Sequence, residues 1–410
     1  MNTINGTTAQ QHTGPLAGMR VLELAQIMAG PTCGMMLADM GADVIKVEKL
    51  PGGDDTRSYT EPSINGESAA FMMLNRNKRG IAVNLKKPGG LELMKRLLAD
   101  ADVVTENYRK GTLDKLGLGY DVLEKLNPRL VYCAISGYGR TGPYADKGGF
   151  DLIAQGFAGI MSITGEPGGP PAKSGTSIAD INAGILAALG IVAALLARAA
   201  TGRGQLVETS LMEAAVHQTF WQSAIYFATG VNPGPTGSAH ILTAPYQAFP
   251  TQDGWINIGG ANQSNWERIV KVIGKPELAR DARFVTNGER MRNLAALVPI
   301  VSERTRTRSS ADWIREFEAA GVPVGPINSI GDMLADPQVK SREMVTEVAH
   351  ARAGRVKTLG TPVKFSDTPT SIRRAAPLLG EHTREVLAAL GYSSAQIGKL
   401  EEEGAVVSAA

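Results

Sequence analysis

The chain has 410 residues, 43% of them hydrophobic, with 42 Lys and Arg against 40 Asp and Glu. This length exceeds what one hydrophobic core usually fills, so we expect two lobes or one elaborated fold. The near balance of charges, spread along the chain, argues against a nucleic-acid partner or a membrane surface and favours small-molecule ligands.

The few cysteines and histidines bear on the cellular compartment and on metal binding. Cys33 and Cys133 are too few for a disulfide framework in a chain of this length, which indicates a reducing compartment and predicts a cytoplasmic protein. No two of the five histidines have the spacing of metal ligands, so no metal site is predicted. Residues 1–15 are polar, lack the apolar segment of a signal peptide and are expected to form a flexible arm.

The first part of the chain alternates predicted strands with predicted helices. Residues 19–25 predict a strand, Gly30 and Pro31 the start of a helix, and Gly41 its end before a second strand. The pattern continues with strands at 42–48, 81–85, 102–108 and 129–136 and helices at 90–101 and 121–127. This alternation predicts an α/β fold with a mainly parallel sheet covered on both faces.

The middle of the chain changes character. Residues 137–175 are rich in Gly and Pro and predict a loop region that builds a site. The charge-free run 183–197 is shorter than the ~20 residues that span a bilayer, so it predicts a buried helix. Further on, the sequence predicts a hairpin around Asp253 and Gly254 and amphipathic helices over 262–274 and 310–320.

Dinucleotide binding is a minor alternative. Glu48 ends the second strand where a ribose-binding acid would stand, but the turn after the first strand lacks GxGxxG. A GxGxxG occurs at 137–142, yet Pro143 follows and no helix begins there to bind a pyrophosphate.

Two basic clusters lie at predicted strand ends. Arg76, Lys78 and Arg79 precede one strand, and Arg109 and Lys110 follow another. Such clusters bind ligands with several phosphate groups, or they are solvated turns. The residues alone leave both interpretations open.

Asp180 stands in TSIADINAG, where the apolar helix begins. Asp is among the best N-cap residues, which makes a cap the simpler interpretation. The same position suits a nucleophile, because a helix N-terminus favours the ionised carboxylate and apolar neighbours exclude water from an activated acyl group.

Several long motifs follow one another in order between Leu16 and about Leu400. They are LAGMRVLELAQIMAGP, GADVIKVEKLPGGDDTR, LNRNKRGIAVNLK, SGYGRTGPY, FDLIAQGFAGIMSITGEP, TGRGQLVETSL and PLLGEHT. With them the chain resembles the family III CoA-transferases (CaiB/BaiF type). The resemblance implies an acyl-CoA:carboxylate CoA-transferase that uses CoA thioesters as substrates and holds no permanent cofactor. It also implies an interlocked homodimer.

The resemblance implies a Rossmann-like large domain made from both ends of the chain and a smaller middle domain. On that basis we predict an arm over 1–15, the large domain over 16–222, a linker over 223–240, a small α+β domain over 241–321 and a return segment over 322–410. Short strands predicted after Val322 agree with a large domain completed by the return segment.

Asp180 matches the family's nucleophile. The implied mechanism forms an aspartyl acyl anhydride and then an aspartyl-CoA thioester on this side chain. The residues implied to line the path of CoA are Ile27, Met28, Ala29, Lys49, Leu74, Lys78, Arg79, Asn107, Tyr108 and Lys147.

At two positions the chain differs from members of the family that catalyse other reactions. The 2-methylacyl-CoA racemases place a proton-transferring histidine directly before the aspartate of FDLIAQ, and here that residue is Phe150. A racemase or epimerase is therefore a disfavoured alternative, and Asp151 is interpreted as a structural or acceptor-side acid. INIGGANQ has only Gly259 and Gly260 where formyl- and oxalyl-transferring members carry a longer run of glycines, which disfavours formate and oxalate.

GSAHILTAPYQAF and GVPVGPINSI resemble members that use succinyl-CoA and small dicarboxylates. His240 would then hold a distal carboxylate, or it caps a linker turn. A CoA-binding partner subunit without its own turnover is the non-enzymatic alternative.

Overall fold

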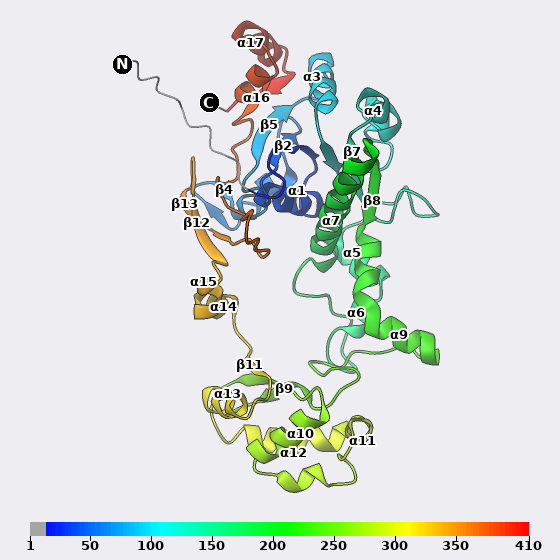
Figure 1. Cartoon of the computed structure of the whole chain (residues 1–410), viewed down its shortest axis with the longest axis vertical. Coiled ribbons are helices and arrows are strands. Elements are labelled where there is room, and N and C mark those ends of the chain that lie inside the picture. Colours follow the sequence, from blue (N-terminus) through cyan, green and yellow to red (C-terminus); the bar gives the residue numbers. More distant parts are fainter. Residues whose placement is uncertain (1–13, 410) are drawn as a thin grey trace. The chain divides into compact units, whose positions relative to one another are not determined.

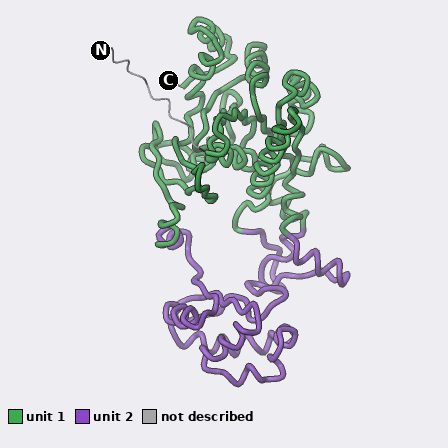
Figure 2. The backbone as a smooth tube through the Cα atoms, in the orientation of Figure 1, with its two compact units in different colours: residues 1–158, 175–218, 337–410 green, residues 159–174, 219–336 purple. Residues whose placement is uncertain are grey.

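The computed structural model describes residues 14–409, so the predicted arm lies almost wholly outside the described residues. The chain forms two compact units (Figure 2): unit 1 runs to residue 158, continues over 175–218 and resumes at 337, and unit 2 comprises 159–174 and 219–336. The predicted boundaries differ from these: they place 159–174 and 219–222 in the large domain and 322–336 in the return segment, whereas all three segments belong to unit 2.

Unit 1 is built on a seven-stranded sheet (Figure 1). Its strands, in spatial order, are β14 (Val406–Val407), β5 (Arg79–Val83), β2 (Asp43–Glu48), β1 (Arg20–Leu24), β6 (Val103–Glu106), β7 (Val131–Ser136) and β8 (Leu206–Ser210). All pairs are parallel except that of β14 with β5. The predicted mainly parallel α/β sheet is confirmed, and β8 and β14 are strands that the sequence did not predict.

The strand order places a topological switch beside β1. From β1 the chain adds β2 and β5 on one side, then crosses over and adds β6, β7 and β8 on the other. In open parallel sheets, ligands bind beyond the carboxyl ends of the strands at such a point. The segments after Leu24 and after Glu106 therefore face one crevice.

Helices cover both faces of this sheet. On one face, α3 (Pro88–Ala99), α4 (Tyr120–Leu126), α16 (Thr383–Ala389) and α17 (Ser394–Glu402) enclose a core that includes Leu22, Leu24 and Val104. Because side chains alternate along a strand, Glu23 points to the opposite face, where α1 (Ala29–Asp39) packs over it. The long helix α7 (Ile178–Thr201) packs against α1, β7 and β8.

Helix α7 is long and apolar enough to cross a membrane by length and composition alone. Core helices pass the same test, and here α7 contacts the sheet and the short helix α8 (Leu211–Val216). Its residues Ala183, Ala187 and Ile191 are buried, as the apolar run predicts.

The remaining elements of unit 1 are short. They are η1 (Asp55–Ser58), β3 (Ser63–Ile64), β4 (Glu67–Ser68), α2 (Ala69–Leu74), η2 (Asp114–Leu116), α5 (Asp151–Phe157), η3 (His217–Thr219, whose last residue falls in unit 2), α15 (Pro337–Ser341), β12 (Val345–His350) and β13 (Gly354–Leu359).

Unit 2 has a three-stranded antiparallel sheet of β9 (Tyr246–Pro250), β10 (Trp255–Gly259) and β11 (Val324–Pro326). Its helices are α6 (Ile160–Ile163), α9 (Phe220–Thr229), α10 (Gln263–Val272), η4 (Pro276–Ala279), α11 (Asn287–Arg292), α12 (Leu294–Thr305), α13 (Ser310–Ala319) and α14 (Ile330–Ala335). Trp266 and Trp313 anchor its core. The hairpin and both amphipathic helices predicted for this region are present, whereas α9 occupies part of the predicted linker.

Candidate functional site

Two cavities lined by described residues of unit 1 could serve as a site. The first, of about 360 Å³, lies at the topological switch and is called the crevice cavity here. It is lined by residues 26–29, 107–110, 135–137 and 145–150 and by Asp55, Thr112, Asp180 and Leu211. It joins the carboxyl ends of β1, β6 and β7 to the start of α7.

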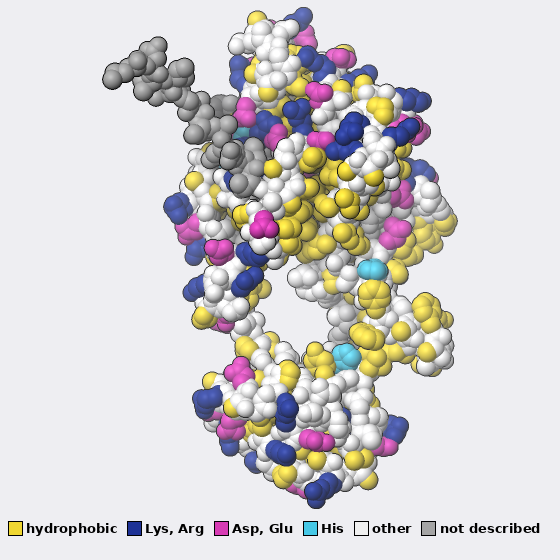
Figure 3. All heavy atoms as spheres, viewed as in Figure 1, with side chains coloured by type: hydrophobic (Ala, Val, Ile, Leu, Met, Phe, Trp, Pro, Cys, Tyr) yellow, Lys and Arg dark blue, Asp and Glu magenta, His cyan; other side chains and the backbone are white. Residues whose placement is uncertain are grey.

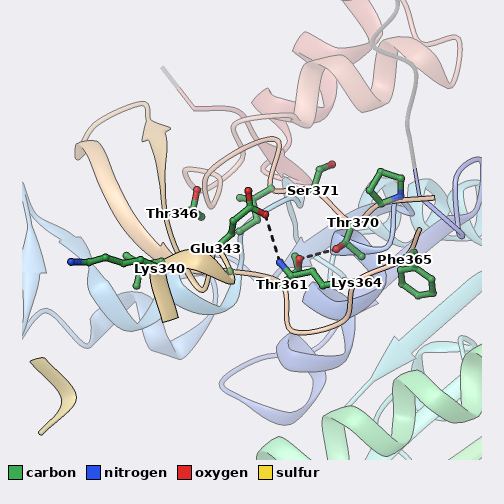
Figure 4. A pocket seen from close by; sticks show the side chains of 12 residues that line it. Lys340, Glu343, Thr346, Thr361, Lys364, Phe365, Thr370 and Ser371 are labelled. Atoms are coloured by element: carbon green, nitrogen blue, oxygen red, sulfur yellow. Dashed lines mark hydrogen bonds and ion pairs between the residues drawn. The ribbon is translucent and has the colours of Figure 1, made fainter. Parts of the chain in front are cut away.

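The second cavity, of about 470 Å³, lies between the β12–β13 hairpin and the segment 360–372 (Figure 4). Figure 4 shows the Thr361 and Thr370 hydroxyls facing each other, 2.7 Å apart. Its one carboxylate, Glu343, is 84% exposed and pairs with Lys364. An exposed, paired carboxylate lacks the dry surroundings of a nucleophile, so the crevice cavity is the candidate active site.

Asp180 is the third residue of α7, and it lines the crevice cavity. Ser177 occupies the N-cap position but makes no side-chain cap hydrogen bond. The cap comes instead from α5: the Asp151 Oδ1 atom accepts hydrogen bonds from the Ala179 amide at 2.9 Å and the Asp180 amide at 3.4 Å. The Asp180 carboxylate is thus spared the capping role that its sequence position suggested.

Burial and a neighbouring charge set the acidity of Asp180. Desolvation, followed by the negative charge of Asp151, raises the pKa of Asp180 to about 6. Among the described residues, no cation or hydrogen-bond donor offsets these two effects. The carboxylate is therefore mostly ionised at neutral pH, yet more basic and more nucleophilic than an ordinary aspartate.

A tight turn between β1 and α1 forms another wall of the crevice cavity. The Asn107 side chain holds it, accepting from the Gln26 amide at 3.0 Å and donating to the Gln26 carbonyl at 2.8 Å. Ile27 adopts φ 68°, a left-handed conformation that a β-branched residue rarely takes. Next to it, Ala29 packs on α7, because Gly184 has no Cβ: one placed there would lie 2.6 Å from the Ala29 oxygen.

The crevice cavity brings together many of the residues predicted to line the path of CoA. These are Ile27, Met28, Ala29, Asn107, Tyr108 and Lys147, gathered with Asp180. Lys147 lies 3.9 Å from the centre of the Tyr144 ring, which fixes the lysine by a cation–π contact.

Four other predicted contacts do not line this cavity. Lys49 is exposed but donates to Gln26 and pairs with Asp55, both of which line it. Leu74 ends α2. Arg79 pairs with two acids, Asp43 and Glu385, and Lys78 is fully buried, with its Nζ 2.8 Å from Glu23.

The residues predicted on the acceptor side divide between the units. Asp151 lies in unit 1 beside Asp180. In unit 2, the His240 ring stacks on Tyr246 with 5.2 Å between ring centres, and its Nδ1 accepts from the Leu242 amide at 3.1 Å. Gly259 ends β10, and Gly260 packs so closely that an added Cβ would lie 2.3 Å from the Pro245 oxygen.

Several lining residues were not among the predicted contacts. The sequence identifies Arg109 and Lys110 only as a basic cluster, Ser136 and Gly137 only as part of the motif SGYGRTGPY, and it does not single out Leu211. Their position in the sequence could have identified them, because residues that directly follow parallel strands beside a topological switch lie at one edge of the sheet. Within residues 14–409 no cluster of three or more His, Cys, Asp or Glu side chains could hold a metal ion.

Comparisons with known proteins agree with this geometry. The family model described as CoA-transferase family III matches residues 16–383. The succinate–glutarate CoA-transferase of Agrobacterium fabrum is 42% identical, over 92% of this chain and 96% of the relative. The succinyl-CoA:glutarate CoA-transferase of Mus musculus is 40% identical, over 94% of this chain and 89% of the relative. A solved CaiB/BaiF family protein from Brucella suis is 42% identical, with a TM-score of 0.83 over 92% of this chain and all of that one.

Proposed function

We propose a specific reaction for this chain, which belongs to CoA-transferase family III: it moves CoA from succinyl-CoA to a small dicarboxylic acid. The observation that carries the proposal is Asp180, a carboxylate of raised pKa in the crevice cavity, whose helix is capped by a different acid. A transferase that works without ATP needs such a group, because its acyl derivatives are close in energy to the substrates.

In the first half-reaction, a carboxylate oxygen of Asp180 attacks the thioester carbon of the donor. The carbon–sulfur bond breaks, CoA leaves as the thiolate, and a mixed anhydride joins the acyl group to Asp180. The thiolate then attacks the Asp180 Cγ atom and displaces the donor carboxylate. The product is an aspartyl-CoA thioester.

The second half-reaction reverses these steps with a new acid. The acceptor carboxylate attacks the aspartyl thioester, releases the thiolate and forms a second anhydride. The thiolate attacks the acyl carbon of the acceptor and frees Asp180. Water would hydrolyse either intermediate, so the apolar residues of α7 behind Asp180 protect them.

The donor and acceptor are proposed from the relatives. Those named for succinyl-CoA or succinate and glutarate are 38–42% identical to this chain, and others are named for citramalate, malate and mesaconate. All these acceptors are dicarboxylic acids with short chains. We therefore propose glutarate as the first acceptor to test, with His240 as a candidate contact for its distal carboxylate.

The racemase alternative finds no support at the crevice cavity. Racemisation needs a pair of groups that exchange a proton with the α-carbon. Phe150 lines the cavity at the position of the expected histidine, and no histidine is among the lining residues that the structure describes. Phenylalanine cannot serve as an acid or a base.

We also propose a homodimer. Figure 3 shows hydrophobic side chains gathered on the visible face over α7, and a second group over α9. Leu189 and Leu196, seven residues apart on α7, are 64% and 75% exposed, and Phe227 on α9 is 84% exposed. Exposed apolar surface of this kind marks association sites. Light scattering of the purified chain should give twice the mass of the monomer, and a monomer at micromolar concentration would contradict this proposal.

The reaction is tested by incubating the purified chain with succinyl-CoA and a panel of mono- and dicarboxylates. Mass spectrometry should detect glutaryl-CoA together with free succinate. No new thioester with any acid would contradict the proposed donor. Turnover by the purified chain would also exclude a partner subunit without its own activity.

A further inference from the structure

Behind the crevice cavity lies a cluster of four buried charges. The side chains of Glu23, Lys46 and Lys78 are fully buried, and Asp54 is 2% exposed. Lys46 Nζ lies 3.0 Å from Glu23 and 2.8 Å from Asp54, and Lys78 Nζ lies 2.8 Å from Glu23. The two cations and two anions balance, which makes the burial of all four tolerable.

This cluster, called the buried quartet here, has no direct part in the proposed chemistry. It reaches the crevice cavity through the turn at Ile27, and Asp55, the residue after Asp54, lines that cavity. The Asp54 carboxylate accepts from the Ile27 amide, with Oδ1 at 3.0 Å and Oδ2 at 3.3 Å. Lys46 donates to the Ala25 carbonyl at 2.9 Å, two residues earlier in the same turn.

The turn needs such an anchor, because Ile27 is left-handed. A β-branched residue in that conformation costs free energy, and it persists only where its surroundings fix it. Two further hydrogen bonds, from the Thr56 amide at 2.9 Å and its hydroxyl at 2.8 Å, hold the Asp54 carboxylate in place. The next residues, Met28 and Ala29, line the cavity, and Ala29 packs against α7 one turn beyond Asp180.

We propose that Asp54 is a positioning residue: with Lys46 it holds Ile27 in the left-handed conformation and so fixes the wall of the crevice cavity that residues 27–29 form. Asp54 itself is buried and is not among the residues that line the cavity. It affects the reaction indirectly: it determines the shape of the turn, and the shape of the turn determines how well the acyl-CoA fits. The inference rests on the proposed function only in assuming that the ligand of this cavity is a CoA thioester.

The test uses Asp54→Asn, Ile27→Gly and the double variant in the full chain. Glycine adopts positive φ without strain, so the turn of Ile27→Gly depends less on its anchor. The matched control is Asp39→Asn, which breaks another buried ion pair, with Arg76 at 2.7 Å, away from the cavity. Binding of CoA is measured by calorimetry, kcat and KM are measured with succinyl-CoA, and thermal unfolding is recorded for each variant.

For Asp54→Asn we expect KM and the Kd of CoA to rise about tenfold, with a smaller change in kcat. The same substitution in Ile27→Gly should raise them less than threefold, and Asp39→Asn should leave both at the wild-type value. An Asp54→Asn chain that folds only in the Ile27→Gly background would also support the inference. The inference would be overturned if Asp54→Asn raised KM and Kd equally with Ile27 and with Gly at position 27, or if it failed to fold in both backgrounds. It would also be overturned if Asp54→Asn kept the wild-type KM and Kd, or if Asp39→Asn raised them as much. If the wild-type chain binds CoA but transfers it to no acid, the proposed function fails, while the Kd comparison still decides the role of Asp54.

Discussion

The Oδ1 atom of Asp151 lies 3.4 Å from the amide nitrogen of Asp180 and 2.9 Å from that of Ala179. One carboxylate therefore caps the helix that carries the other and repels its negative charge. The cap orients Asp180, and the repulsion, added to burial, raises the pKa of Asp180.

Activity should depend on the ionisation of Asp180. The pKa of Asp180 is raised to about 6, and only the carboxylate attacks a thioester. We expect kcat/KM to be constant at alkaline pH and to fall tenfold per unit below about pH 6. Initial rates with succinyl-CoA in overlapping buffers check this, and a limb near pH 4 would contradict the raised pKa.

Two substitutions at Asp151 separate its two effects. An asparagine at this position still offers an oxygen to the Ala179 amide but carries no charge, so Asp151→Asn should move the acidic limb down by roughly half a unit to one unit. Asp151→Ala also removes the cap and should cost about 1 kcal/mol of stability. The pH profile and urea unfolding of both variants test this. An unchanged limb in Asp151→Asn would show that burial alone sets the pKa of Asp180.

Asp180 should lower the stability of the folded chain at neutral pH. The pKa of Asp180 in the folded chain lies above the ordinary value of 3.8, so ionisation of this side chain is less favourable in the folded chain than in the unfolded chain. The folded chain therefore keeps its full stability below about pH 4 and loses part of it as the pH rises through about 6. Asp180→Asn removes this loss, so its free energy of unfolding relative to wild type should increase by about 2 kcal/mol from pH 4 to pH 8. The variant should have no activity. Urea unfolding at both values of pH measures the difference. A variant whose advantage is the same at both would contradict the shift.

The contact of α1 with α7 should tolerate no extra atom at Gly184. A Cβ there would lie 2.6 Å from the Ala29 oxygen and 2.7 Å from the Thr32 Cβ, and both belong to a helix packed on the sheet. We expect Gly184→Ala to lower kcat/KM at least tenfold and to destabilise the fold by about 1–3 kcal/mol. Gly398→Ala is the control: Gly398 also lies in a helix, α17, but a Cβ added there would have no atom within 4 Å. Equal activity of the two variants would show that the helices can separate without harm.

Much of the fold could be predicted from local patterns. The βαβ alternation gave five strands of the large sheet, because buried parallel strands are short apolar runs between Gly and Pro signals. Strand β8 was missed, since its residues Leu206, Val207 and Glu208 are partly exposed at the sheet edge and show no such run. The two residues of β14 are too few to give a pattern.

The site was predicted less completely, and the reason is distance along the chain. The motifs located Asp180 and the turn at Ile27, but no local signal showed that Asp151 would cap a helix 28 residues further on. Lys78 was expected on the path of CoA because it is basic and lies at a strand end. Its burial against Glu23 depends on α1 covering that face of the sheet, which only the tertiary fold determines.

The most direct test of the central claim, that Asp180 is the nucleophile, follows oxygen atoms. The acceptor carboxylate attacks Asp180 Cγ, and collapse of the second anhydride leaves one acceptor oxygen on the aspartate. After a single turnover of the aspartyl-CoA form with glutarate labelled by oxygen-18, the peptide that contains Asp180 should carry one labelled oxygen. Turnover that leaves this peptide unlabelled, or that places the label on another residue, would contradict the account.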